Sequence, residues 1–108
     1  MIIELRVYHC APGHLPALCK SFEQVSLPFW DKHGIRQAGF FTTLIGPSNQ
    51  TLTYLLQWDS LAERERIWNN FVTDPEWIAS RKATAATSPV VERVETSFLT
   101  PTSFSALR

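Results

Sequence analysis

Three polar side chains share one side of the first extended segment. Glu4, Arg6 and Tyr8 alternate with apolar residues, so a strand would point all three to the same face. A guanidinium can bind a carboxylate or an enolate, and a phenol beside it can orient the bound group. Arg6 and Tyr8 are therefore candidates for holding a small ligand. The same side chains could instead form an ion-pair ladder with a neighbouring strand, or face solvent.

Three histidines, His9, His14 and His33, offer acid–base or metal chemistry. His33 follows Trp30 at helical spacing and is expected to end the first helix, where a cation suits the helix dipole. Alternatively, His33 is a general base near the mouth of a pocket with Trp30 as a wall. No two histidines have metal-ligand spacing and no cysteine completes a set, so we expect no metal held by protein side chains.

The sequence contains no motif for covalent catalysis or phosphate binding. Cys10 and Cys19 are not spaced as C-x-x-C and are too few for a disulfide framework, so both are expected to be free thiols. His9 and Cys10 are neighbours on a strand and would point to opposite faces, which prevents a direct dyad. There is no G-x-S-x-G, and the four glycines form no phosphate-binding loop.

Composition narrows the class of protein. The chain has 108 residues, ten Lys+Arg against ten Asp+Glu, and 44% hydrophobic residues including four tryptophans. We expect one domain over residues 1–108, too apolar to be disordered, with no charge excess for nucleic acid or an anionic membrane. No apolar run approaches a membrane span, and the acidic Glu4 argues against a transit peptide, so a cytoplasmic location is expected. A chain this short favours association with a partner subunit.

The pattern of the first half predicts a strand, a helix and a hairpin. Residues 2–9 alternate, whereas from Leu15 onward apolar residues recur at three- and four-residue steps, which is typical of an amphipathic helix. Pro28 removes one backbone donor and should kink or end this helix. The aromatic and β-branched segment 36–45 and the alternating segment 51–58 are expected to pair as a hairpin across a turn-forming connection.

The second half predicts a broken helix and a last strand. Ser60 and Glu63 have capping-box spacing, so a helix should begin there. Asp74 and Pro75 interrupt it and can open a second helical segment. The β-branched segment 90–99 is expected to form the fourth strand.

The element order βαββαβ predicts a ferredoxin-like α+β fold, an antiparallel sheet with helices on one face only. The first and last strands are neighbours in this topology, so pairs between Glu4 or Arg6 and Arg93 or Glu95 are expected. The bare sheet face should be covered by a second sheet or a ligand, because strands two and three carry large apolar residues on both sides. These residues are Phe40 with Leu44 on one side and Phe41 with Ile45 on the other.

Two aromatic residues of the third strand could add to a site. Tyr54 and Trp58 lie on one side of that strand and could line a cavity between the sheet and the helices, together with Phe22 and Phe29. The alternative is that these rings are simply the core. Trp68, on an apolar helical stripe, has the same two interpretations.

Several segments together resemble the NIPSNAP family. They include ELRVY at 4–8, GFFTTLIGP at 39–47, WDSLAER at 58–64 and DPEW at 74–77, with shorter pieces at 12–13, 27–28, 33–34, 49–50 and 101–105. No single piece is specific, but their order and spacing cover nearly the whole chain. The resemblance implies a dimeric α/β barrel, in which two ferredoxin-like units pack their open sheet faces together as a homodimer.

The superfamily implied by the resemblance contains cofactor-independent monooxygenases, haem-degrading enzymes and isomerases, so its fold alone indicates no reaction. The haem-degrading relatives ligate iron through a histidine in the second helical region. Residues 60–88 contain no histidine here, which argues against haem, and no cofactor is expected. Trp68 could still resemble the aromatic residue that those enzymes place over their substrate.

The sequence therefore predicts a homodimeric NIPSNAP-type domain that binds a small organic molecule. The candidate ligand-binding residues are Arg6, Tyr8, His33, Tyr54 and Trp58. One alternative is a cofactor-independent monooxygenase or isomerase acting on an aromatic or enolisable substrate. The other is a non-catalytic interaction module that works through the dimer surface. Nucleic acid and membrane partners are not expected.

Overall fold

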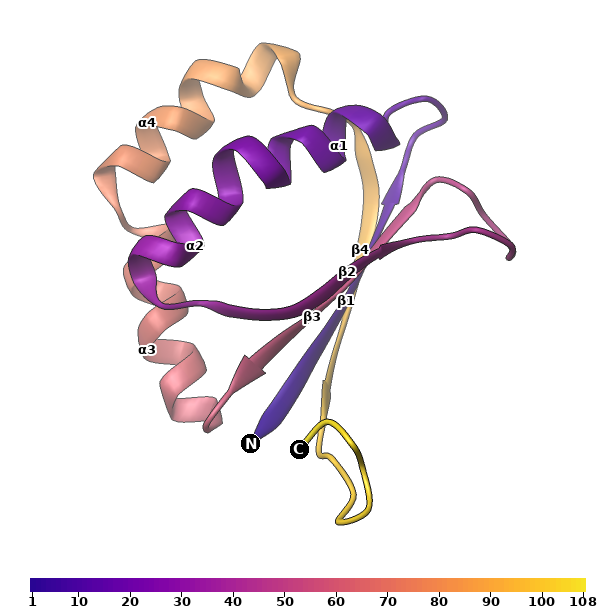
Figure 1. The fold of residues 1–108 in the computed structure, drawn as a ribbon. Helices are drawn as coiled ribbons and strands as arrows, with labels where there is room; N and C mark the ends of the chain where they lie inside the picture. The colour runs from indigo at the N-terminus through magenta and orange to yellow at the C-terminus, as the bar shows by residue number, and fades with distance from the viewer.

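The computed structural model describes residues 1–108 and has the βαββαβ order (Figure 1). The first helical region contains a π-helical turn, and the second is divided at Asp74. The elements are β1 (Ile2–Cys10), α1 (Leu15–Ser21), the π turn η1 (Phe22–Ser26), α2 (Leu27–His33), β2 (Arg36–Thr42), β3 (Thr51–Trp58), α3 (Leu61–Val72), α4 (Pro75–Thr84), the 3-10 turn η2 (Ala85–Thr87) and β4 (Val91–Leu99).

The four strands form one antiparallel sheet in the order β2-β3-β1-β4. In this register Glu4 lies opposite Leu56, and Arg6 lies opposite Tyr54. Directly opposed residues share a face, so the polar side of β1 and the buried side of β3 point the same way. The predicted ferredoxin-like α+β fold is confirmed.

The helices cover one face of this sheet and leave the other bare, as Figure 1 shows with the sheet seen nearly edge-on. The core lies in the layer between sheet and helices, where Tyr54 and Leu56 of β3 are fully buried against Leu18, Phe22 and Trp30. No helix is long and apolar enough to cross a bilayer. The polar side of β1 therefore faces the helices.

The first helix continues past Pro28, which the sequence predicted would kink or end it. Because Pro28 has no N–H, one helical bond cannot form, and the chain instead makes a π turn immediately before it. The Leu27 N–H donates to the Phe22 carbonyl, five residues back. The helix ends after His33, where Gly34 adopts a left-handed conformation with φ of 77°.

The second helical region begins and breaks where its caps indicate. The Ser60 hydroxyl accepts from the Glu63 N–H at 3.1 Å, and the Glu63 carboxylate accepts from the Asp59 N–H. The Asp74 side chain accepts from the Glu76 N–H at 2.9 Å and begins α4. The predicted division of this region is confirmed.

The second strand is shorter than the sequence pattern predicted. β2 ends at Thr42, and Leu44 and Ile45 lie in the β2–β3 loop with 95% and 93% of their surface exposed. The expected alternation of Phe40 with Leu44 and Phe41 with Ile45 is therefore wrong. The pairing of β2 with β3 ends at Thr42, opposite Leu52. The Thr43 hydroxyl still pairs with that of Thr51 at 2.8 Å, but the apolar residues beyond it have no strand partner.

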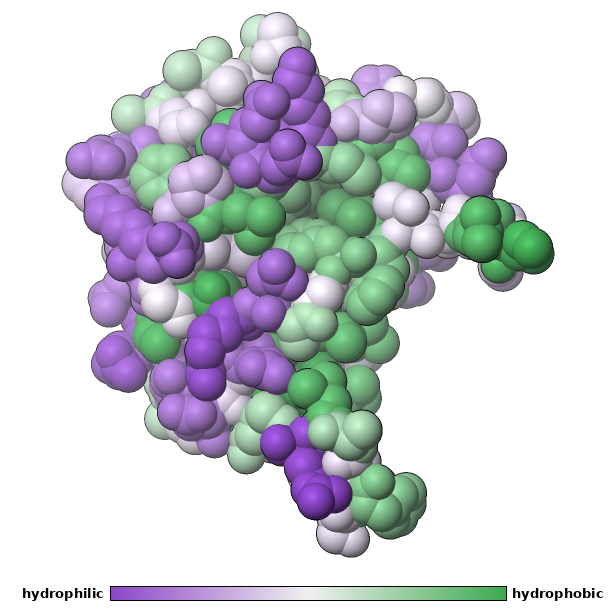
Figure 2. Space-filling view, viewed as in Figure 1, coloured by the Kyte–Doolittle hydropathy of each residue, from purple (hydrophilic) through white to green (hydrophobic).

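The bare sheet face has an apolar centre, although the charged cluster of His9, Arg93 and Glu95 lies on the same face. Leu5 and Val7 of β1 and Leu55 of β3 lie on it half-buried, while Phe41 at its edge is 54% exposed. Figure 2 shows further apolar surface in the gap between sheet and helices and in a projection where the β2–β3 loop lies. An apolar sheet face of this kind is unusual on a monomer in water.

Candidate functional site

A fully buried carboxylate, that of Glu4, lies beneath the helical layer with 0% of the residue exposed. It accepts from the Trp58 indole Nε1 at 3.0 Å and from Arg64 of α3 at 3.1 and 3.3 Å. Arg6 Nη1 donates to it at 3.4 Å. Burying an anion requires such charge-assisted partners, and here they come from β1, β3 and α3. The carboxylate therefore ties α3 to the two central strands.

The expected cross-strand pairs between β1 and β4 are absent on this face. Glu4 lies opposite Phe98 and Arg6 opposite Thr96, so β4 presents no charge to them. Arg93 and Glu95 project from the other face, where Glu95 pairs with His9 at 3.1 Å. The prediction is wrong because it did not include the register of β4, which decides which side of that strand each charge occupies.

Arg6 and two tyrosines extend this cluster towards the helices. Arg6 Nη2 donates to the Tyr8 hydroxyl at 3.3 Å, and the Tyr54 hydroxyl donates to the same oxygen at 3.4 Å. Burial of Tyr54 raises its pKa far above the usual range, so its proton stays in place. The Arg6 guanidinium also lies 5.2 Å from the centre of the Trp68 ring.

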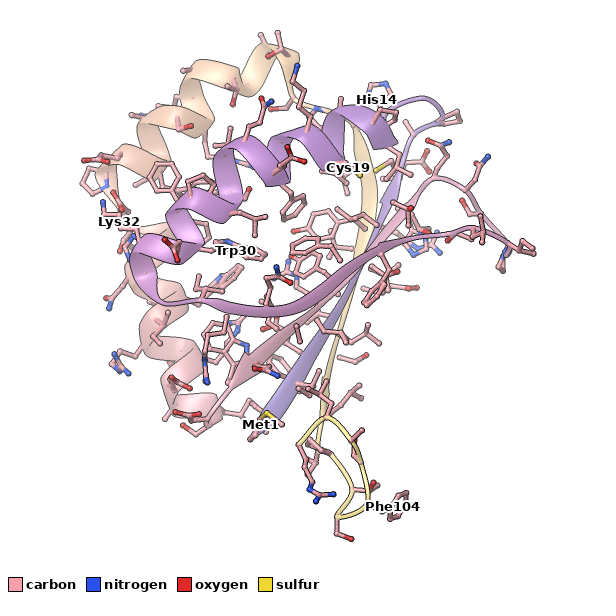
Figure 3. All side chains as sticks on the ribbon, in the orientation of Figure 1. Met1, His14, Cys19, Trp30, Lys32 and Phe104 are labelled. Carbon is pink, nitrogen blue, oxygen red and sulfur yellow. The ribbon has the colours of Figure 1, made fainter.

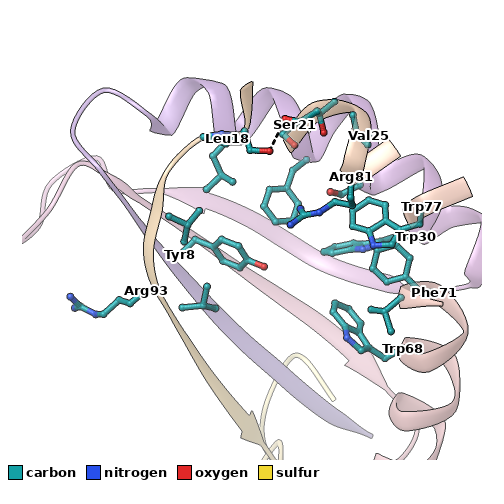
Figure 4. Close-up of a pocket in the computed structure, with 18 residues that line it drawn as sticks. Tyr8, Leu18, Ser21, Val25, Trp30, Trp68, Phe71, Trp77, Arg81 and Arg93 are labelled. Carbon is teal, nitrogen blue, oxygen red and sulfur yellow. Dashed lines mark hydrogen bonds between the residues drawn. The ribbon is translucent and has the colours of Figure 1, made fainter. Parts of the chain in front are cut away.

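A cavity of about 640 Å³ opens above Tyr8, between the sheet and the helices (Figure 4). Aromatic rings from α2, α3 and α4 form much of its wall, and Tyr8, Val91 and Val94 form the sheet side. The size lies within the range of small-molecule sites, roughly 300–1,000 Å³. The full lining is Tyr8, Leu18, Ser21, Phe22, Val25, Ser26, Trp30, Trp68, Phe71, Val72, Trp77, Arg81, Thr84, Ser88, Pro89, Val91, Arg93 and Val94.

The polar side chains that line this cavity are the Tyr8 phenol, two arginines and the hydroxyls of Ser21, Ser26, Thr84 and Ser88. Figure 4 shows the Tyr8 hydroxyl directed into it and Arg81 of α4 reaching over it, whereas Arg93 extends away. Trp30, which Figure 3 shows directed from α2 towards the sheet, is 2% exposed and its Nε1 has no hydrogen-bond partner. The Arg81 guanidinium lies 5.5 Å from the centre of the Trp77 ring and pairs with no carboxylate. Such an arrangement can orient one polar end of an apolar ligand.

His33 belongs to a different cluster, at the junction of α2 and α4. Its Nε2 lies 2.7 Å from Asp74 Oδ2, and Lys32 Nζ lies 2.8 Å from the same oxygen. These two hydrogen bonds are the main reason that the pKa of Asp74 lies well below its ordinary value. The Asp74 carboxylate thus joins the end of α2 to the start of α4, and His33 does not line the cavity.

Both cysteines are free, as expected. Burial is the main cause that raises the pKa of the Cys10 thiol and of the Cys19 thiol. A protonated thiol is a poor nucleophile. Neither cysteine lines the cavity, and no cluster of His, Cys, Asp and Glu could hold a metal ion.

The structure brings four of the five candidate residues together. Arg6, Tyr8 and Tyr54 form a hydrogen-bonded chain, and Trp58 joins it through Glu4. Only Tyr8 lines the cavity, and the other three lie beneath or beside it.

Sequence reasoning missed two arginines. Arg64 supplies the main partner of Glu4, and Arg81 stands over the cavity. Arg64 precedes Trp68 by one helical turn, which places the two on one helix face, but only the packing of α3 on the sheet shows that this face meets Glu4.

The fold and cavity define a ferredoxin-like domain with a ligand-sized space between its sheet and helices. The NIPSNAP profile matches residues 3–106, and this chain belongs to the NIPSNAP family. The predicted resemblance is confirmed. No curated protein matches the chain in sequence.

Crystal structures of family members are similar to this chain throughout. A NIPSNAP family protein of unknown function from Agrobacterium tumefaciens is 26% identical with a TM-score of 0.86, over 100% of this chain and 94% of the other. A NIPSNAP-like domain protein from Burkholderia xenovorans is 28% identical with a TM-score of 0.82, over 96% and 87%. A dimeric ferredoxin-like protein from an uncultured marine organism shares the fold at 12% identity and a TM-score of 0.67, over 96% of each chain.

The buried Glu4 cluster makes a prediction about stability. Replacing Glu4 with Gln leaves two guanidinium groups without their counter-charge, and we expect a loss of about 3–5 kcal/mol in the free energy of unfolding. Urea unfolding followed by tryptophan fluorescence measures it. Glu65→Gln, which removes an exposed carboxylate of α3 that makes no ion pair, is the matched control and should change little. Equal effects of the two substitutions would contradict the assigned role of Glu4.

The depressed pKa of Asp74 makes a prediction about pH. A carboxylate with a lowered pKa in the folded state stabilises fully above its ordinary value of 3.8 and progressively less as pH falls below it. Asp74→Asn should therefore be less stable than the wild type at pH 7, and the difference should shrink below about pH 4. Thermal melting from pH 3 to 7 checks this. A difference that stays constant with pH would show that the charge of Asp74 is not involved.

Proposed function

We propose that the chain is a single domain that forms a homodimer and binds a small organic molecule in the cavity above Tyr8. The observation that carries the proposal is the cavity itself, of about 640 Å³, where 11 of the 18 lining residues are hydrophobic. A mainly apolar space with a few directed polar groups is typical of small-molecule sites. Tyr8 contacts the ligand in this proposal, while Arg6 and Tyr54 hold the Tyr8 hydroxyl in position.

The bare apolar sheet face supports the homodimer. Leu5, Val7 and Leu55 would be removed from water if a second copy packed its own sheet face on them. The two copies together form the expected dimeric α/β barrel. A fold relative of this chain is described as dimeric, which agrees with this arrangement.

Cofactor-independent oxygenation or isomerisation is the second candidate function. The observation that favours it is the chain of donors from Arg6 and Tyr54 to Tyr8, which could stabilise a developing enolate oxygen. Turnover of an aromatic or enolisable substrate by the wild type, lost in Tyr8→Phe, would distinguish an enzyme from a binding protein.

A non-catalytic interaction module remains the competing class. It would use the exposed apolar residues Leu44, Ile45 and Phe104, which project from the β2–β3 loop and the C-terminal tail. We also propose a cytoplasmic location, which suits two free thiols because disulfides rarely persist in a reducing compartment.

Filling the cavity tests the binding function. N-phenyl-1-naphthylamine, a neutral probe that fluoresces in apolar surroundings, should bind the wild type. Val94→Trp places a large ring at the sheet side of the cavity and should weaken binding about tenfold or more. Val90→Trp is the matched control, because Val90 is exposed and does not line the cavity. Equal binding by both variants would place the probe elsewhere and remove the support for this site.

Sedimentation velocity tests the dimer. At micromolar concentration the wild type should sediment as a dimer, and Val7→Glu should sediment as a monomer because it buries an unpaired charge between the sheet faces. The control Leu61→Glu places the same charge at an exposed position of α3 and should leave the dimer intact. A monomeric wild type would contradict the proposed barrel.

A further inference from the structure

The Tyr8 hydroxyl has a proton for which the protein provides no acceptor. Its oxygen accepts from Arg6, which can only donate, and from Tyr54. Tyr54 is 0% exposed and its raised pKa keeps it protonated, so its proton is satisfied only by donating to Tyr8. The Tyr8 proton is therefore left to point outward, into the cavity.

The Trp30 indole is a second donor without an acceptor on the same cavity. Only 2% of the Trp30 surface is exposed, and its Nε1 makes no hydrogen bond. The rings of Trp30 and Tyr8 both pack against Phe22, with centroid distances of 5.8 and 5.4 Å, and both pack against Tyr54 at 5.5 and 5.6 Å. Both donors therefore belong to residues that line the cavity and share two aromatic neighbours. A buried donor left unpaired is destabilising, and an acceptor on a ligand would remove that cost.

The charge around these donors is positive. Glu4 contributes one negative charge, and it pairs with two arginines, Arg6 and Arg64, neither of which pairs with another carboxylate. The cluster beneath Tyr8 therefore carries one net positive charge. Arg81, over the cavity, is a further unpaired cation, and no Asp or Glu lines the space.

We propose that the cavity selects a carboxylate on a flat apolar body, whose two oxygens accept from the Tyr8 hydroxyl and the Trp30 indole N–H. This inference rests on the proposed binding function of the same cavity and names its ligand class. A planar carboxylate offers one acceptor oxygen to each donor, and the excess guanidinium charge favours the anion over a neutral ester or ketone. The surrounding rings of Phe22, Trp68 and Phe71 bind the apolar body.

Three matched probes test the inference by isothermal titration calorimetry: 2-naphthoate, methyl 2-naphthoate and naphthalene. We expect 2-naphthoate to bind the wild type about tenfold or more tightly than the ester, because a charged acceptor makes the stronger hydrogen bonds. Naphthalene reports binding of the apolar body alone. If none of the three binds, the proposed function itself fails. If all three bind equally, the cavity binds apolar molecules and only the carboxylate inference fails.

Two variants connect the selectivity to the donors. Tyr8→Phe and Trp30→Phe should each reduce the acid-to-ester affinity ratio about five- to tenfold while naphthalene still binds. Trp77→Phe is the matched control, since it removes an indole from the same wall that is not an orphaned buried donor, and should preserve the ratio.

Thermal melting of each variant reports whether it folds, so that Trp30→Phe can decide the question if Tyr8→Phe does not fold. A ratio unchanged in a folded donor variant, or reduced equally in Trp77→Phe, would overturn the proposal. A loss of acid selectivity in Arg81→Gln with none in Tyr8→Phe would also overturn it, because it would place the carboxylate at the mouth.

Discussion

The fully buried carboxylate of Glu4 is the constraint on which this structure depends. Its charge is tolerated only because Arg6, Arg64 and Trp58 donate to it from three different elements. Apolar packing between a helix and a sheet can slide, whereas these directed donors specify where α3 lies over β1 and β3. The position of α3 in turn determines where Trp68 and Phe71 meet the cavity.

The same cluster explains why the space above Tyr8 is polar at one end. Two guanidinium groups around one carboxylate leave a positive excess, and hydrogen bonds from Arg6 and Tyr54 occupy the Tyr8 oxygen. Tyr8 therefore acts as a donor towards the cavity. An arrangement needed to bury Glu4 thus also produces the orientation that a ligand would meet, which makes stability and binding parts of one network.

The helical layer is positioned by two further local features. The π turn before Pro28 accommodates the missing N–H without ending the helix, so α2 continues and carries Trp30 to the core. Asp74 begins α4 and holds Lys32 and His33 at the end of α2. Together these features position α2 and α4, and residues of both helices line the cavity.

Local sequence determined the elements of this protein and the polar side of its first strand. Alternation, caps at Ser60 and Asp74, and helical periodicity act over a few residues, so they can be recognised without the fold. The end of β2, the partner of Glu4 and the orphaned donor of Trp30 depend on which segments meet across long sequence separations. Those contacts are decided by strand register and by helix packing on the sheet, and only the tertiary structure contains them.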